Sequence, residues 1–190
     1  MVSTIFQGEL VRLISEDSEI FAKNFSCWGR DSEYHRLLDN DPARLVSVKT
    51  AKKWFESDLD RDVFEGCFFM IQPLDTDQSI GFIGLGGISW NHAETWVGIG
   101  IGERAYWGKG YGTDAMRVIL CYAFTELNLH RVSLGVFEYN PRAIHSYEKA
   151  GFVQEGRNRK QVLREGKRWD EVHMGVLRGE WLERDKGGVS

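Results

Sequence analysis

The sequence of 190 residues has little cysteine, no long hydrophobic run and no excess of positive charge. Its three cysteines, Cys27, Cys67 and Cys121, are odd in number and lack CxxC or metal-ligand spacing. We therefore expect reduced, buried thiols, with neither a disulfide framework nor a metal site. The first residues carry no charged-then-apolar signal, and no segment is long enough to span a membrane. This favours a cytoplasmic protein without a membrane partner.

The formal net charge of −4 argues against direct nucleic-acid binding, which depends on many phosphate contacts. Apolar residues make up 42% and charged residues 27%, the proportions of an ordinary globular protein that can bury a core. No internal repeat, low-complexity tract or linker divides the chain. We therefore expect one domain over residues 1–190.

The spacing of the apolar residues predicts both strands and helices. The predicted strands are 9–14, 64–72, 80–90, 95–102, 131–137, 152–163 and 169–177. The predicted helices are 20–28, 31–38, 47–59, 113–127 and 140–151. This order predicts an α+β (mixed α/β) fold, with a mostly antiparallel twisted sheet of about seven strands flanked by helices.

The glycine-rich segment 107–113, Trp-Gly-Lys-Gly-Tyr-Gly-Thr, joins the strand 95–102 to the helix 113–127. A glycine turn at a helix N-terminus exposes backbone N–H groups at the positive end of the helix dipole, which favours a bound phosphate. The spacing fits neither a P-loop nor a dinucleotide fingerprint, because Gly110 follows Lys109 and the glycines run G-x-G-x-G. A plain glycine-rich turn is the alternative.

In the strand 95–102, every second residue from 98 to 102 is glycine, and the residues between are apolar. Because side chains alternate along a strand, one face packs apolar groups and the other is bare backbone. Bare backbone indicates close approach of a ligand or of another segment, such as a tightly packed helix.

The helix after Asn140 places three residues on one face, since Asn140, Ala143 and Tyr147 fall at i, i+3 and i+7. The small alanine between two polar side chains leaves room for a thin ligand chain. On its own, Tyr147 could equally be a core aromatic whose hydroxyl reaches a neighbour.

Two segments resemble the GNAT family of N-acetyltransferases. Tyr106-Trp-Gly-Lys-Gly-Tyr-Gly-Thr-Asp-Ala resembles its pyrophosphate loop, Gln/Arg-x-x-Gly-x-Gly/Ala, with Trp107 at the Gln/Arg position. Asn140-Pro-Arg-Ala-Ile-His-Ser-Tyr-Glu-Lys-Ala-Gly-Phe resembles the signature Asn-x-x-Ala-x-x-x-Tyr-Glu-x-x-Gly-Phe. The likeness extends over the whole chain and is strongest to the branch of ribosomal-protein N-terminal and spermidine acetyltransferases.

The resemblance implies acetyl-CoA as co-substrate, with its pyrophosphate on the loop amides and its pantetheine arm along the strand 95–102. A backbone N–H near Ile99 to Ile101 would polarise the thioester carbonyl. Tyr147 would protonate the departing thiolate, because a phenol with an ordinary pKa near 10 is protonated at neutral pH. The implied cofactor-binding residues are Ile99, Gly100, Ile101, Trp107, Gly108, Lys109, Gly110, Tyr111, Gly112, Thr113, Asn140 and Ala143.

The acceptor amine must lose a proton before it attacks. Glu94, at the start of its strand, is the candidate general base, although a surface carboxylate at a hairpin end explains it equally well. His92 is a weaker candidate at a turn. Family resemblance places the acceptor between the N-terminal helices and the closing hairpin. The predicted substrate-binding residues there are Trp28, Asp31, Glu33 and Tyr34, a cluster suited to a cation but also typical of a solvated helix face.

These features together predict an acetyl-CoA-dependent N-acetyltransferase that acts by direct attack of a primary amine on the thioester. The acceptor is a protein N-terminus or a small amine such as a polyamine, and a homodimer is possible. The alternative is a non-catalytic CoA-binding sensor or interaction module.

Overall fold

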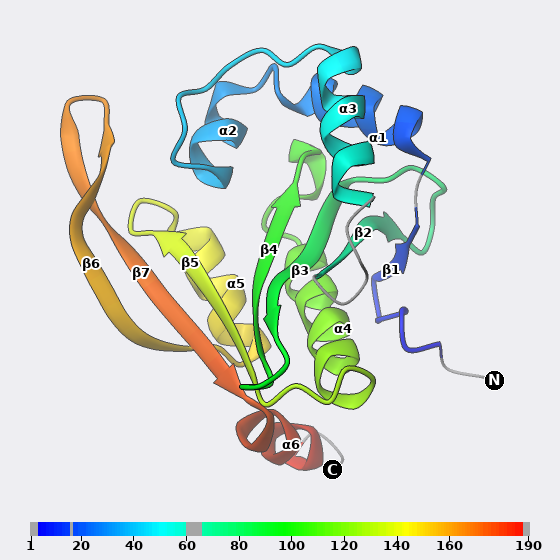
Figure 1. Ribbon diagram of the computed structural model, residues 1–190, viewed down its shortest axis with the longest axis vertical. Coiled ribbons are helices and arrows are strands. Elements are labelled where there is room, and N and C mark those ends of the chain that lie inside the picture. Colours follow the sequence, from blue (N-terminus) through cyan, green and yellow to red (C-terminus); the bar gives the residue numbers. More distant parts are fainter. Residues whose placement is uncertain (1–3, 16, 60–65, 188–190) are drawn as a thin grey trace.

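The computed structural model describes residues 4–15, 17–59 and 66–187, in which seven strands form one sheet (Figure 1). The strands are β1 (Val11–Ile14), β2 (Gly66–Pro73), β3 (Gly81–Ser89), β4 (Glu94–Ile101), β5 (Arg131–Phe137), β6 (Val153–Arg164) and β7 (Lys167–Leu177). The helices are α1 (Ser18–Trp28), α2 (Ser32–Leu38), α3 (Val48–Leu59), α4 (Tyr111–Thr125), α5 (Pro141–Ala150) and α6 (Arg178–Gly187), with a short 3-10 turn at Arg104–Tyr106.

The sheet runs in the order β1-β2-β3-β4-β5-β7-β6, and every neighbouring pair except β4 and β5 is antiparallel. The predicted mixed α/β class with a mostly antiparallel sheet of seven strands is therefore confirmed. None of the helices in the described part of the chain is long and apolar enough to cross a membrane.

Helix caps explain where several helices begin and end. Asp31 accepts hydrogen bonds from the first free amides of α2, and Asn140 does the same for α5, with Pro141 at the first helical position. Gly151 ends α5 with φ 114°, a left-handed conformation that glycine adopts without steric cost. These caps fix the position of the two helices that face the glycine loop.

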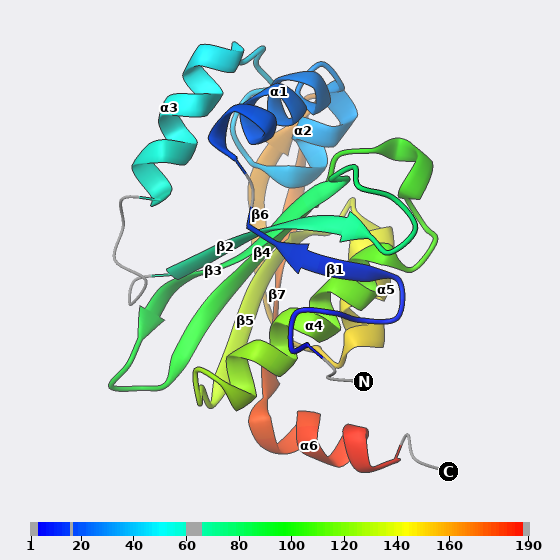
Figure 2. The ribbon, with the colours of Figure 1, turned by 90° about the vertical axis from the view of Figure 1, so that its right-hand side faces the viewer.

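The helices cover the sheet in two groups (Figure 2). α4 and α5 lie against one face, where the apolar stripe of α4 forms the main core with β3, β4, β5 and β7. α1, α2 and α3 gather at one end over the other face, around an aromatic cluster in which the Phe21 and Phe55 rings stack at 4.2 Å. The sheet thus separates an α4–α5 side from an α1–α3 side.

The strands β4 and β5 separate along their length. They pair in parallel only from Glu94–Arg131 to Trp96–Ser133, although β4 remains paired with β3 as far as Ile101–Gly81. Within the described residues, the β5-side edge of β4 therefore has no strand partner beyond Trp96. Free backbone groups at a strand edge can pair with an extended ligand.

Three details differ from the sequence-based expectation or fall outside it. α6 was not predicted, because its composition is polar and only Trp181 packs on the core, 5.5 Å from the Phe124 ring. The three thiols are free, but Cys27 is exposed, so the expectation that all three are buried is wrong. The predicted beginning of the second strand at Phe64 lies outside the described residues.

Candidate functional site

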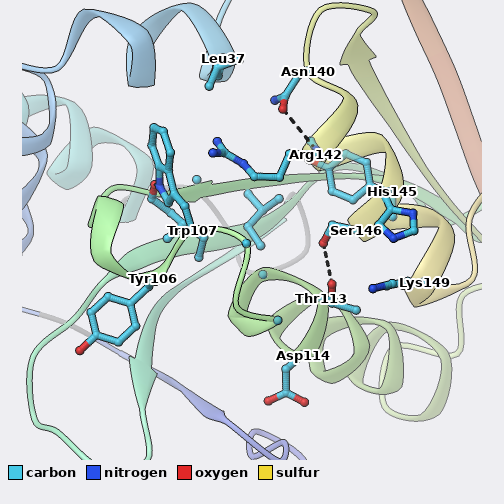
Figure 3. Close-up of a pocket in the computed structure, with 18 of the residues that line it drawn as sticks. Leu37, Tyr106, Trp107, Thr113, Asp114, Asn140, Arg142, His145, Ser146 and Lys149 are labelled. Carbon is cyan, nitrogen blue, oxygen red and sulfur yellow. Dashed lines mark hydrogen bonds between the residues drawn. The ribbon is translucent and has the colours of Figure 1, made fainter.

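A cavity of about 400 Å³ opens where β4, the glycine loop and α5 meet (Figure 3). Most of the predicted cofactor-binding residues line it: Ile99, Gly100, Ile101, Trp107, Gly108, Gly110, Gly112, Thr113, Asn140 and Ala143. The predicted catalytic Tyr147 lines it too. Lys109 and Tyr111 do not; the Tyr111 ring instead packs edge-on against Tyr106 at 4.9 Å.

The loop itself requires glycine at two positions. Gly108 has φ 71° and Gly110 has φ 94°, values that cost other L-residues about 1–2 kcal/mol. Gly110 is also the N-cap of α4 and provides no side-chain cap. Within the described residues, the amides of Tyr111 to Thr113 have no hydrogen-bond acceptor, so they are free to bind an anion at the positive end of the helix.

Two polar contacts hold α5 against the loop. Thr113 Oγ1 and Ser146 Oγ lie 2.7 Å apart, which ties the first turn of α4 to the middle of α5. Asn140 Oδ1 accepts from the Ala143 amide at 3.2 Å and thereby caps the first turn of α5. Figure 3 shows both contacts beside the cavity.

The sequence analysis did not identify the basic residues around this cavity. Arg142, His145 and Lys149 of α5 and Arg117 of α4 line it, and the three on α5 follow the helical spacing i, i+3 and i+7 (Figure 3). That spacing was visible in the sequence and would have predicted a positive face beside the loop. Free amides and a basic rim together suit a ligand with several phosphates.

Trp107, at the family's Gln/Arg position, has a structural role of its own. Its Nε1 donates to the carbonyl of Ile101 at 2.7 Å, which holds the loop against the end of β4. The guanidinium carbons of Arg142 and Arg104 lie 3.9 Å and 4.7 Å from its ring centroids. Trp107 therefore positions two cations at the entrance of the loop.

The glycine face of β4 is only partly open. A side chain at Gly100 would meet Tyr34 and Leu38, and one at Gly102 would meet the Trp28 ring. At Gly98 no atom lies within 4 Å of the added carbon. At the loop end of the strand, the glycines therefore make room for packed helices, as one of the two interpretations of the sequence predicts. At Gly98 the backbone is open, as the other predicts.

Tyr147 lines both the 400 Å³ cavity and a second one of about 890 Å³. Its ring packs near Phe152, with centroids 6.1 Å apart. Burial raises the pKa of Tyr147 to about 12. The phenol is therefore neutral and able to donate a hydrogen bond at any physiological pH.

The two candidate bases lie elsewhere. Glu94 is exposed at the start of β4 and lines neither cavity, and His92 lies in the preceding turn. From Glu94 to Gly100 the strand advances by six residues, about 20 Å at about 3.3 Å per residue. Glu94 and His92 therefore line neither of the cavities that Tyr147 lines, and their role as base stays a prediction.

The predicted substrate cluster is mostly engaged within the protein. Arg104 forms ion pairs with Asp31 and, at 2.6 Å, with Glu33, and its hydrogen bond to Asp31 lowers the pKa of that carboxyl. Trp28 is buried and donates to Glu103 Oε1 at 2.8 Å. Tyr34 alone lines the cavity; burial raises its pKa, and its hydroxyl has no partner among the described residues.

A phosphate cradle that leads to an unpaired strand edge and a buried phenol fits a ligand with phosphates, a long arm and a reactive end. A family model described as the acetyltransferase (GNAT) domain matches residues 9–153, which is more than half of the chain. The chain belongs to the GNAT acetyltransferase family. The resemblance inferred from the two sequence segments is thereby confirmed.

Two curated relatives illustrate the similarity. The chain is 35% identical to the probable N-acetyltransferase YjcK of Bacillus subtilis, over 89% of this chain and 87% of the relative. It is 38% identical to a spermidine N(1)-acetyltransferase of Vibrio cholerae over 42% of this chain, and that alignment spans only 46% of the relative.

Among solved structures, the chain is similar to the spermidine N-acetyltransferase from Vibrio cholerae in complex with CoA and spermine, with a TM-score of 0.78. The sequences are 23% identical, and the match covers 90% of this chain and 98% of the other. This likeness supports the fold.

Proposed function

We propose that this protein transfers the acetyl group of acetyl-CoA to a primary amine. One observation carries the proposal. The free amides of the loop, the unpaired edge of β4 and the buried Tyr147 hydroxyl all lie along the same cavity. The donor set fits CoA: backbone amides and basic side chains suit phosphates, and a strand edge suits an arm of amide bonds.

In this proposal the amides from Gly108 to Thr113 and the basic rim hold the pyrophosphate. A backbone N–H between Ile99 and Ile101 stabilises the negative charge that develops on the thioester oxygen. Tyr147 gives its proton to the departing thiolate. Asn140 lies beside this path, where its cap already fixes the start of α5.

The acceptor is a small amine, of which a polyamine is the first candidate, or a protein N-terminus. The relatives named as spermidine acetyltransferases support the polyamine. We also propose a protein of one domain that acts in the cytoplasm and can form a homodimer. In the alternative, a CoA-binding module without catalysis, the Tyr147 hydroxyl would have no catalytic role.

Release of free CoA thiol tests the proposal. Purified protein is incubated with acetyl-CoA and spermidine, spermine or short peptides with free N-termini, and the acetylated product is identified by mass spectrometry. We expect thiol release that depends on the amine. Saturable acetyl-CoA binding without transfer to any of these amines would instead support the non-catalytic module.

A further inference from the structure

The second cavity, of about 890 Å³, is lined from both faces of the sheet, by Tyr122 of α4 and Tyr147 of α5 as well as by Leu37 and Leu38 of α2. Bare backbone forms part of its floor on both sides of the gap between β4 and β5, at Gly98 and Gly135. Trp96 and Phe137 contribute aromatic rings to the walls, and Tyr147 reaches this cavity from α5. Tyr147 therefore lines this cavity together with Trp96, Gly98 and Gly135.

Two carboxylates line this cavity, that of Asp39, which is exposed after α2, and that of Glu171, which is half-buried on β7. Strand pairing places Glu171 opposite Phe137 of β5, and its side chain is 19% exposed. An atom added at Gly135 would lie 2.9 Å from Glu171 Oε1, so the carboxylate occupies the space that the missing side chain leaves. Gln161 Nε2 donates to the other oxygen, Oε2, at 2.7 Å, which fixes the orientation of the group.

Among the described residues, no lysine or arginine side chain pairs with Glu171. His173 Nε2 lies 3.7 Å from Oε2, but Asn158 Nδ2 lies 2.8 Å from the same nitrogen. The His173 ring packs edge-on against Trp96 at 6.0 Å, which holds the aromatic wall in place. A partly buried carboxylate without a cationic partner is costly unless a ligand provides the charge.

We infer that Glu171 binds the ammonium group of the acceptor and takes its first proton. The inference rests on the proposed function and names the group that selects a charged primary amine. The ammonium lies between Trp96 and Glu171 Oε1, where an aromatic face and a carboxylate both attract a cation. The open backbone at Gly98 leaves space for the alkyl chain of the amine.

The proton balance follows from these positions. The ammonium gives one proton to Glu171, which later releases it to water. The free amine then forms a C–N bond with the thioester carbon as the C–S bond breaks. Tyr147 gives its proton to the thiolate. The second proton that the nitrogen loses then converts the phenolate of Tyr147 back to the phenol. One proton is released to solvent for each acetyl group transferred.

Three variants test the inference: Glu171→Gln, the charge-conserving Glu171→Asp, and the matched control Glu126→Gln on the exposed end of α4, which lines neither cavity. Initial rates of thiol release are measured with spermidine and with a short peptide that has a free N-terminus. Loss of a charge-assisted hydrogen bond predicts that kcat/KM for the amine falls about 10- to 100-fold in Glu171→Gln.

We expect Glu171→Asp to recover part of that loss and Glu126→Gln to match the wild type. The KM for acetyl-CoA should stay within about twofold in every variant, which also shows that the variants are folded. If the wild type turns over an amine and Glu171→Gln keeps its kcat/KM within threefold, the assignment of Glu171 is wrong while the proposed function stands. If the wild type acetylates neither probe, the proposed function fails, and this assignment fails with it.

Discussion

Replacement of Tyr147 by phenylalanine removes one buried hydroxyl and leaves the ring that packs beside Phe152. Tyr147 lines both cavities, and it is the only residue with a hydroxyl among the described residues that do so. The variant should fold normally and bind acetyl-CoA with an unchanged KM. Its kcat should fall, because the thiolate would then leave without a proton donor.

The raised pKa of Tyr147 sets the size of the expected decrease in kcat. Burial raises the pKa of Tyr147 to about 12, whereas an ordinary thiol has a pKa of about 8.5. Complete transfer from the free phenol to the free thiolate is thus uphill by about 3.5 pK units, or about 5 kcal/mol. The hydroxyl acts first as a hydrogen-bond donor to the developing charge, and general acids of this kind contribute about 10²- to 10⁴-fold. We expect a decrease near the lower limit, about 100-fold.

The measurement is the initial rate of thiol release between about pH 6 and pH 11. At each pH the rate is taken at amine concentrations spaced about tenfold apart. The acid form of Tyr147 persists below its raised pKa and is lost only above about pH 12, so the wild type should show no alkaline decrease from this group in that range. Tyr139→Phe is the matched control, since Tyr139 lines neither cavity and donates instead to the Arg36 carbonyl. A Tyr147→Phe kcat within twofold of the wild type would refute the assignment.

Three further predictions concern the frame of the site. Asp114 accepts from the amides of Glu9, Leu10 and Val11, so Asp114→Ala should lower the free energy of unfolding by about 3 kcal/mol in urea denaturation. Gly110→Ala forces φ 94° on an alanine, which should cost about 1–2 kcal/mol of stability and raise the KM for acetyl-CoA in steady-state assays. Asn140→Ala should lower the melting temperature through loss of about 1 kcal/mol of capping.

Features with a local cause were predictable from the sequence. The caps of α5 depend on Asn140, Pro141 and Gly151 alone, and the free amides of the loop depend on glycines within a few residues. Apolar spacing was sufficient for the strands β1 to β5 and β7, because each of them has buried residues in the core, whereas β6 is mostly exposed and was predicted from its place in the closing hairpin. α6 has no such pattern, since ten mostly polar residues contribute one ring to the core, and the sequence therefore gave no signal for it.

Features that depend on which strands pair could not be predicted in the same way. Glu94 and Glu171 both lie at strand positions, and nothing nearby in the sequence distinguishes them. Insertion of β7 beside β5 places Glu171 opposite Phe137, where the gap between β4 and β5 has opened, while Glu94 lies where the two strands still pair. Strand pairing, and not local sequence, therefore sets where each carboxylate lies relative to that gap.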